Sequence, residues 1–272
     1  MTFEVHILNS FTGSNSEGNP AGVVISTEEL PSVIMQEIAS KMNLSETAFL
    51  FPLPHKKNKY KIRWFTPVLE VPLCGHGTLA AAALLYKKQL FKSSVVFHSL
   101  SGILRVRREG HKFILDFPLD IPVEYEPPDK LFMAMGIDSY VSCVIGKLTG
   151  YILIHLQSER KVAEICPNYP LLKAINPSEA KGITVTATTD NTEYDFVSRF
   201  FDPWAGIMED PVTGSAHTLL GPYWSAILGK KKMVAKQISS RGGILYLKMK
   251  NRERIYIAGN AKIVGQDTIS II

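Results

Sequence analysis

The feature that most constrains this chain is an internal repeat of three matched blocks. In the first block, residues 63–67 (RWFTP) correspond to residues 199–203 (RFFDP), so that an aromatic segment ends at a proline in both. A proline stops the hydrogen bonding of a central strand. The second block pairs residues 72–79 (PLCGHGTL) with residues 211–219 (PVTGSAHTL), with one residue inserted, and an apolar helical segment follows each. A repeat of this length fixes the architecture before any single motif is considered.

The third block is a glycine turn that leads into an alternating strand. Residues 99–106 (SLSGILRV) correspond to residues 240–247 (SRGGILYL), and the spacing from the second block is nearly the same in both copies. Alternation after such a turn is typical of a strand. Each half is therefore predicted to run strand, loop, helix, strand, hairpin, strand.

A connector rich in proline and acidic residues, beginning at residues 117–122 (FPLDIP), separates the two copies. Such a composition is typical of a linker. We place the boundary near Asp120, which gives an N-terminal half of residues 1–120 and a C-terminal half of residues 121–272. Further elements are expected from apolar periodicity: a helix at 31–42, with Ile34, Ile38 and Met42 on its buried face, and strands at 3–8, 21–25, 47–51, 140–145, 151–156 and 185–188.

Composition narrows the functional class. The 272 residues carry a formal net charge of +5, and the lysine-rich stretches at 56–61 and 230–236 have no nucleic-acid-binding motif beside them, so we interpret both as solvated faces. The three cysteines lack CxxC spacing, which argues against a disulfide framework or a zinc site and favours a reducing compartment. Residues 1–10 lack the features of a signal peptide, and the longest apolar run, 79–86, is too short to cross a bilayer. We expect a cytoplasmic protein that binds neither nucleic acid nor membrane.

The second block of each half carries the strongest indication of a ligand. A helix N-terminus exposes unpaired N–H groups, and a glycine there, Gly75 or Gly214, allows a ligand to approach the backbone. One such turn alone is adequately explained as a glycine-containing helix cap. Two matched turns related by an approximate two-fold axis instead predict a single carboxylate or phosphate gripped between two helix N-termini.

The motifs together resemble those of the phenazine-biosynthesis F-type family. The resemblance rests on residues 18–21 (GNPA), 43–49 (NLSETAF), 63–67, 72–78 and 209–217 (EDPVTGSAH), and it covers essentially the whole chain in order. It implies an α+β fold like that of diaminopimelate epimerase, with two pseudo-symmetric halves that each wrap a curved, mostly antiparallel sheet around a central helix. It also implies a site in the cleft between the halves and a homodimer.

The resemblance further implies roles for individual residues. Glu46 matches the acid/base glutamate, while Asp210 and His76 match further catalytic groups; the expected substrate-binding residues are Asn19, Gly75, Gly214 and Ser215. No metal or organic cofactor is implied. By residue type alone, Glu46 reads equally as a surface carboxylate, Asp210 as a turn residue before a proline and His76 as a structural histidine. A position at a helix N-terminus predicts that His76 is neutral.

Cys74 bears on the mechanism because diaminopimelate epimerase uses one cysteine from each half as its two bases. Here Cys74 aligns with Thr213, which cannot act as a base at neutral pH. A helix start is expected to lower the pKa of Cys74. With only one thiol in the pair, racemisation by two thiols is disfavoured, and we interpret Cys74 as a packing or substrate-facing residue.

The leading hypothesis is an isomerase that moves a proton between carbons of a small carboxylate, with Glu46 as the acid/base. An amino-acid epimerase or racemase, with Glu46 and Cys74 on opposite faces of the substrate, is the alternative within the enzyme class. A non-catalytic ligand-binding protein of the same fold is the alternative outside it.

Overall fold

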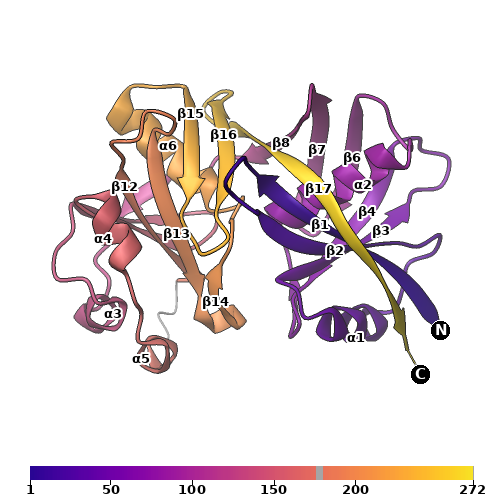
Figure 1. Cartoon of the computed structure of the whole chain (residues 1–272), viewed down its shortest axis with the longest axis horizontal. Helices are drawn as coiled ribbons and strands as arrows, with labels where there is room; N and C mark the ends of the chain where they lie inside the picture. Colours follow the sequence, from indigo (N-terminus) through magenta and orange to yellow (C-terminus); the bar gives the residue numbers. More distant parts are fainter. Residues whose placement is uncertain (176–179, 272) are drawn as a thin grey trace. The chain divides into compact units, whose positions relative to one another are not determined.

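The computed structural model describes residues 1–175 and 180–271, which divide into two compact units (Figure 1). Unit 1 comprises residues 1–117 together with the C-terminal segment from Tyr256, and unit 2 comprises residues 118–255. The sequence placed all of 121–272 in the second half. By contacts, however, the last segment lies with unit 1, because β17 (Arg254–Ser270) pairs antiparallel along β1 (Thr2–Thr12).

Unit 1 is a mixed, mostly antiparallel sheet around one helix. Its strands are β2 (Asn19–Ile25), β3 (Glu46–Pro52), β4 (Lys59–Phe65), β5 (Glu70–Val71), β6 (Ser94–Ser99), β7 (Gly102–Glu109) and β8 (Lys112–Pro118), besides β1 and β17. The pairs β2–β3 and β4–β6 are parallel, and the pairs β1–β2, β3–β4, β4–β5, β6–β7 and β7–β8 are antiparallel. The helix α2 (Gly75–Lys87) contacts β1, β2 and β3 and is buried from Gly75 to Leu85, so it forms the centre of the unit.

Unit 2 repeats this plan. Its strands are β9 (Pro122–Glu124), β10 (Ser142–Gly146), β11 (Tyr151–His155), β12 (Gly182–Thr188), β13 (Phe196–Asp202), β14 (Ile207–Asp210), β15 (Lys232–Gln237) and β16 (Gly243–Met249). The parallel pairs are β11–β12 and β13–β15, at the positions where unit 1 has β2–β3 and β4–β6. The apolar helix α6 (His217–Leu228) takes the place of α2. The α+β fold with two pseudo-symmetric halves is therefore confirmed.

The repeat extends to side chains of the first block. Arg63 forms a bidentate pair with Glu70 of β5, at 2.7 and 2.6 Å, and its guanidinium lies 5.2 Å from the Phe65 ring centroid. Arg199 forms the same pair with Glu209 of β14, at 2.7 and 2.9 Å, and lies 5.0 Å from the Phe201 ring. In each unit this ion pair links a short strand, β5 or β14, to the preceding strand of the hairpin, β4 or β13, which ends near the proline.

Helices outside the repeat cover the outer faces of the sheets. In unit 1, α1 (Ser32–Met42) buries Met35, Ile38 and Ala39 against β3 and β4, while Ile34 and Met42 are only partly buried. The expected stripe is therefore displaced by about one residue. In unit 2, three short helices were not predicted from the sequence, because each is too short to show a helical period: α3 (Asp129–Met135), α4 (Glu159–Glu164) and α5 (Tyr169–Ala174).

The connector around Asp120 is an anchored segment of unit 2 rather than a loose linker. Asp120 is fully buried, and its carboxylate accepts hydrogen bonds from Leu148 N–H and from the N–H and hydroxyl of Thr149. Its own N–H donates to the carbonyl of Thr218 at 3.1 Å. That carbonyl is available because Pro222, one turn later in α6, has no N–H to donate to it.

Candidate active site

The N-terminus of α2 is capped by Cys74. Its Sγ accepts the N–H of Gly77 at 3.2 Å, and its carbonyl accepts both the N–H and the hydroxyl of Thr78. The N–H groups of Gly75 and His76 lie in the first turn, where a helix offers no carbonyl partner. They are therefore the donors that this helix start presents to a ligand.

The His76 side chain is held between residues at the starts of two parallel strands. Ala21 of β2 lies opposite Glu46 of β3, so Asn19 and Glu46 meet at the same edge of the sheet. His76 Nε2 lies 3.0 Å from Glu46 Oε2, and its Nδ1 lies 3.2 Å from Asn19 Nδ2. Ser10 donates its hydroxyl to the His76 carbonyl at 2.8 Å. All four residues are buried.

The protonation of His76 follows from these partners. Because Asn19 Nδ2 donates to Nδ1, the proton of a neutral ring lies on Nε2, facing Glu46. Burial lowers the pKa of His76, but the charge of the Glu46 carboxylate raises it. The Glu46 carboxylate therefore opposes the expected preference for a neutral ring, whereas the Asn19 donor at Nδ1 favours it.

The Cys74 thiol has the opposite character from the one expected. Its Sγ lies 3.7 Å from His76 Nδ1 and 3.9 Å from Nε2. Burial and then the charge of Glu46 raise its pKa to about 11, although His76 and the Gly77 N–H act in the other direction. Cys74 is accordingly a neutral thiol at pH 7, and the predicted activation by the helix start is outweighed.

Two polar atoms at this site accept or donate no hydrogen bond among the described residues. Glu46 Oε2 is one, although it lies 3.0 Å from His76 Nε2, and the indole Nε1 of Trp64 is the other. A Cβ placed on Gly77 would lie 2.9 Å from Cys74 Sγ and 3.3 Å from Trp64 Nε1, so the thiol and the indole both lie against Gly77. Buried polar atoms without a hydrogen-bond partner indicate that a polar ligand binds beside them.

In unit 2, Asp210 ends β14 and is almost fully buried. Its Oδ2 accepts the Thr213 hydroxyl at 2.5 Å, and its carbonyl accepts Gln237 Nε2 at 2.7 Å. Gln237 Oε1 also accepts the Thr213 N–H at 2.8 Å. The buried Gln237, at the end of β15, therefore holds the turn through both its amide nitrogen and its amide oxygen. This residue was not predicted from the sequence, because a glutamine at a strand end forms no distinctive motif.

The turn at Gly214 differs from that at Gly75. The bonds His217 N–H to Gly214 O and Thr218 N–H to Ser215 O each span three residues, so α6 begins only at His217. Gly214 and Ser215 lie in this tighter turn, and Ser215 Oγ is 3.2 Å from the hydroxyl oxygen of Tyr151. The sequence placed both helix starts at the glycine, which holds for α2 and not for α6.

The predicted site residues thus form two groups. Asn19, Glu46, Gly75 and His76 come together in unit 1, beside Cys74. Asp210, Gly214 and Ser215 come together in unit 2.

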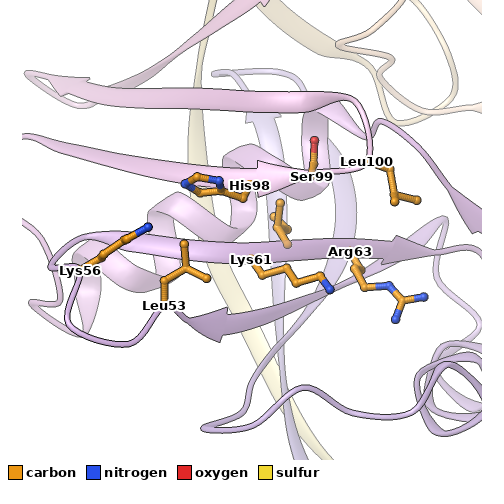
Figure 2. A pocket seen from close by; sticks show the side chains of 8 residues that line it. Leu53, Lys56, Lys61, Arg63, His98, Ser99 and Leu100 are labelled. Carbon is orange, nitrogen blue, oxygen red and sulfur yellow. The ribbon is translucent and has the colours of Figure 1, made fainter.

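A hollow of about 460 Å³ also lies in unit 1, between β4, β6 and the loop before β4 (Figure 2). None of the predicted site residues lines it. It holds the basic side chains of Lys56, Lys61, Arg63 and His98, but Lys61 and Arg63 are already paired with acidic residues of the same unit.

The sequence pattern of the phenazine biosynthesis-like protein family (PhzC-PhzF) matches residues 8–266. The chain belongs to this family. An uncharacterized isomerase of Halalkalibacterium halodurans is 40% identical over 267 residues, which cover 97% of each chain. The resemblance read from the motifs is confirmed.

Solved structures agree with this assignment. The crystal structure of a phenazine biosynthesis protein of the PhzF family from Enterococcus faecalis superposes with a TM-score of 0.88 at 36% identity, over the whole of both chains. A hydroxyproline epimerase from Agrobacterium vitis, at 11% identity, gives 0.62 over 98% of this chain and 92% of its own, and so shares the fold. Family membership and the names of relatives support an isomerase-type function. None of the helices in the described ranges has the length and hydropathy needed to cross a membrane.

Proposed function

We propose that this family member is an isomerase that moves a proton on a small carboxylate substrate, with Glu46 as the acid/base and without a cofactor. The observation that supports this most directly is the state of Glu46 Oε2. This atom is buried, accepts no hydrogen bond among the described residues and lies 3.0 Å from His76 Nε2. Its lone pairs are therefore open to a proton on substrate carbon.

His76 is proposed to assist the proton transfer. A protonated or Nε2–H imidazole beside Glu46 stabilises the carboxylate before the reaction and can reorient towards the substrate as charge develops there. Asn19 fixes the ring through Nδ1, and Ser45 donates to Asn19 Oδ1 at 3.3 Å. A second proton on Nδ1 would require the Asn19 amide to turn its oxygen towards the ring.

The substrate carboxylate is proposed to bind the backbone N–H groups of Gly75 and His76, with those of Gly214 and Ser215 as further donors. Asp210, which is oriented by Thr213 and Gln237, would accept a hydrogen bond from an amino or hydroxyl group of the substrate. We also propose the homodimer that the family resemblance implies and the cytoplasmic location that the composition favours.

Epimerisation by the Glu46–Cys74 pair is less well supported. Two bases on opposite faces of one carbon, each about 3 to 3.5 Å from it, stand roughly 6 to 7 Å apart. The ligand atoms of Glu46, Cys74 and His76 all lie within 4.8 Å of one another. Chiral analysis of the product separates the two reactions.

The proposal is tested by incubating the protein in deuterium oxide with a panel of small amino and hydroxy carboxylates, while NMR follows deuterium at carbon. We expect wash-in for at least one unsaturated member of the panel, together with a shifted double bond. Binding of panel members without any exchange would favour the non-catalytic alternative.

A further inference from the structure

We propose that the hollow between β4, β6 and the loop before β4 is a second ligand site. It would take a small organic anion, with a carboxylate or phosphate group on an apolar body. The volume of the hollow, about 460 Å³, is in the range of small-molecule sites. None of the residues of the Glu46 group lines it, so binding here does not depend on the proposed function.

The hollow lies where β4 changes its neighbour in the sheet. The parallel ladder of β4 with β6 ends at the pair Lys61–His98, and β4 next pairs with β5 from Trp64 onwards. Ile62 and Arg63 lie between these two ladders, and both line the hollow. Where neighbouring parallel strands separate beyond their carboxyl ends, they leave a crevice that suits a ligand.

Unit 2 closes the corresponding fork with its own chain. Ile238 follows β15 as Leu100 follows β6, and Ser198 precedes the matched arginine of the repeat as Ile62 does. The Ile238 N–H donates to the Ser198 carbonyl at 2.8 Å, and Ile238 packs against the core of unit 2. In the described part of the chain no such backbone bond joins Leu100 to Ile62, and Leu100 is 70% exposed. The fork in unit 1 is therefore left open.

The charge of the lining favours an anion. None of the eight lining residues is acidic, and Lys61 and Arg63 are each paired with a carboxylate from outside the lining. Lys56 forms no ion pair among the described residues, so it is the cation left over. Figure 2 shows its side chain extending towards the His98 ring, whereas Lys61 and Arg63 extend along β4 away from both. This gives Lys56 a role beyond the solvated face expected from the sequence.

The apolar part of the ligand is expected to lie over Leu53 and Leu100. An exposed ion pair alone contributes little to affinity, whereas covering an exposed leucine side chain is favourable. The Leu100 N–H, which forms no ladder bond to β4, is a further donor for a ligand oxygen. The site should therefore require both parts of the ligand, the anionic group and the apolar body.

The test follows the amide resonances of the isotopically labelled full chain by NMR while phenyl phosphate or phenylacetate is added. Benzyl alcohol and inorganic phosphate are the control ligands, because each lacks one of the two parts. We expect both probes to shift the resonances of Leu53, His98 and Leu100, with at least about tenfold higher affinity than either control ligand. Shifts at Gly75 and His76 report binding at the proposed active site separately, so each proposal can fail without the other.

A matched pair of variants tests the contribution of Lys56. Lys56→Glu and Lys57→Glu make the same charge change at neighbouring exposed positions, but only Lys56 lines the hollow. Charge reversal turns attraction into repulsion, so probe binding at the hollow should weaken at least about tenfold in Lys56→Glu. In Lys57→Glu it should change less than about twofold, because exposed charges at a distance are screened.

Equal weakening in the two variants would reduce the effect to general attraction by a basic surface and would overturn the inference. Binding of benzyl alcohol as tight as that of the probes would also overturn it, as would the absence of shifts at the hollow. If the hollow takes no probe and Leu100→Asp converts a dimer into monomers, the face belongs instead to a contact with a second copy of the chain.

Discussion

Two buried histidines near the starts of the central helices have opposite electrostatic surroundings. His76 of α2 faces the Glu46 carboxylate, and its pKa is raised. His217 of α6 contacts the Thr213 carbonyl at 2.8 Å through Nδ1, and its ring stacks near Phe196. Burial lowers the pKa of His217 to about 4. The second half of the repeat thus keeps its helix-start histidine neutral, whereas the first places its histidine beside a carboxylate that favours the charged ring.

The lowered pKa of His217 predicts a pH-dependent loss of stability. The unfolded chain takes up this proton near pH 6.5 and the folded chain only near pH 4, so the free energy of unfolding falls as the pH drops through that window. The expected loss is about 3 kcal/mol. In His217→Asn, which retains a donor for the Thr213 carbonyl, urea unfolding at pH 7 and pH 4 should show a correspondingly smaller difference. An equal fall in both proteins would contradict the assignment.

At the scale of elements, the start of α2 is packed too tightly for a side chain on Gly77. A Cβ there would meet Cys74 Sγ at 2.9 Å and Trp64 Cδ1 at 3.0 Å. We expect Gly77→Ala to lower the free energy of unfolding by about 1 to 3 kcal/mol, despite the better helix propensity of alanine. Gly265→Ala is the control, since its nearest neighbour, Ile7 Cδ1, is 3.9 Å away. Similar stabilities of the two variants in urea would contradict this packing.

The paired arginines of the repeat give a second test. Lysine cannot form the bidentate bonds, so Arg63→Lys should cost about 1 to 2 kcal/mol. Arg199→Lys should cost about 1 kcal/mol more. The reason is that Arg199 also donates to three carbonyls at and just beyond the C-terminal end of α4, those of Val162, Ala163 and Ile165. The further bonds of Arg63, to Ser32 Oγ and Glu29 Oε1, are fewer and exposed. Urea unfolding of both variants measures the difference, and the reverse order would show that the α4 contacts contribute little.

The elements inside the repeat could be predicted from the sequence because the order of the blocks and the spacing between them both constrain where each helix and strand lies. The helix start at Gly75 follows from its motif, and the strands expected from residues 21 and 47 begin at Asn19 and Glu46. The later start of α6 could not be predicted, because a turn whose hydrogen bonds span three residues and an α-helical turn favour the same residue types. The pKa directions of Cys74 and His76 were missed because they depend on a carboxylate 28 or more residues away in the sequence, brought near only by the parallel pairing of β2 and β3.

At the scale of the whole molecule, the C-terminal segment completes unit 1. Ile257, Ala258 and Ile271 are buried, and β17 pairs with β1 from Thr2 to Thr12. A chain that ends at Ile255 should therefore lose hydrogen-exchange protection in β1 while β12 and β13 of unit 2 keep theirs. Unchanged protection of β1 would contradict the division, and equal loss in both units would show that they unfold together.

The central claim is that Glu46 carries the proton, and deuterium exchange in Glu46→Gln tests it most directly. The amide retains the size of the side chain but cannot take up a proton, so exchange at substrate carbon should fall by about a hundred- to ten-thousandfold. Affinity for a substrate analogue, measured by calorimetry, should change little. Cys74→Ser should stay within about tenfold of wild type, because the thiol is protonated at pH 7. Exchange at the wild-type rate in Glu46→Gln, or an equal loss in Cys74→Ser, would contradict the account.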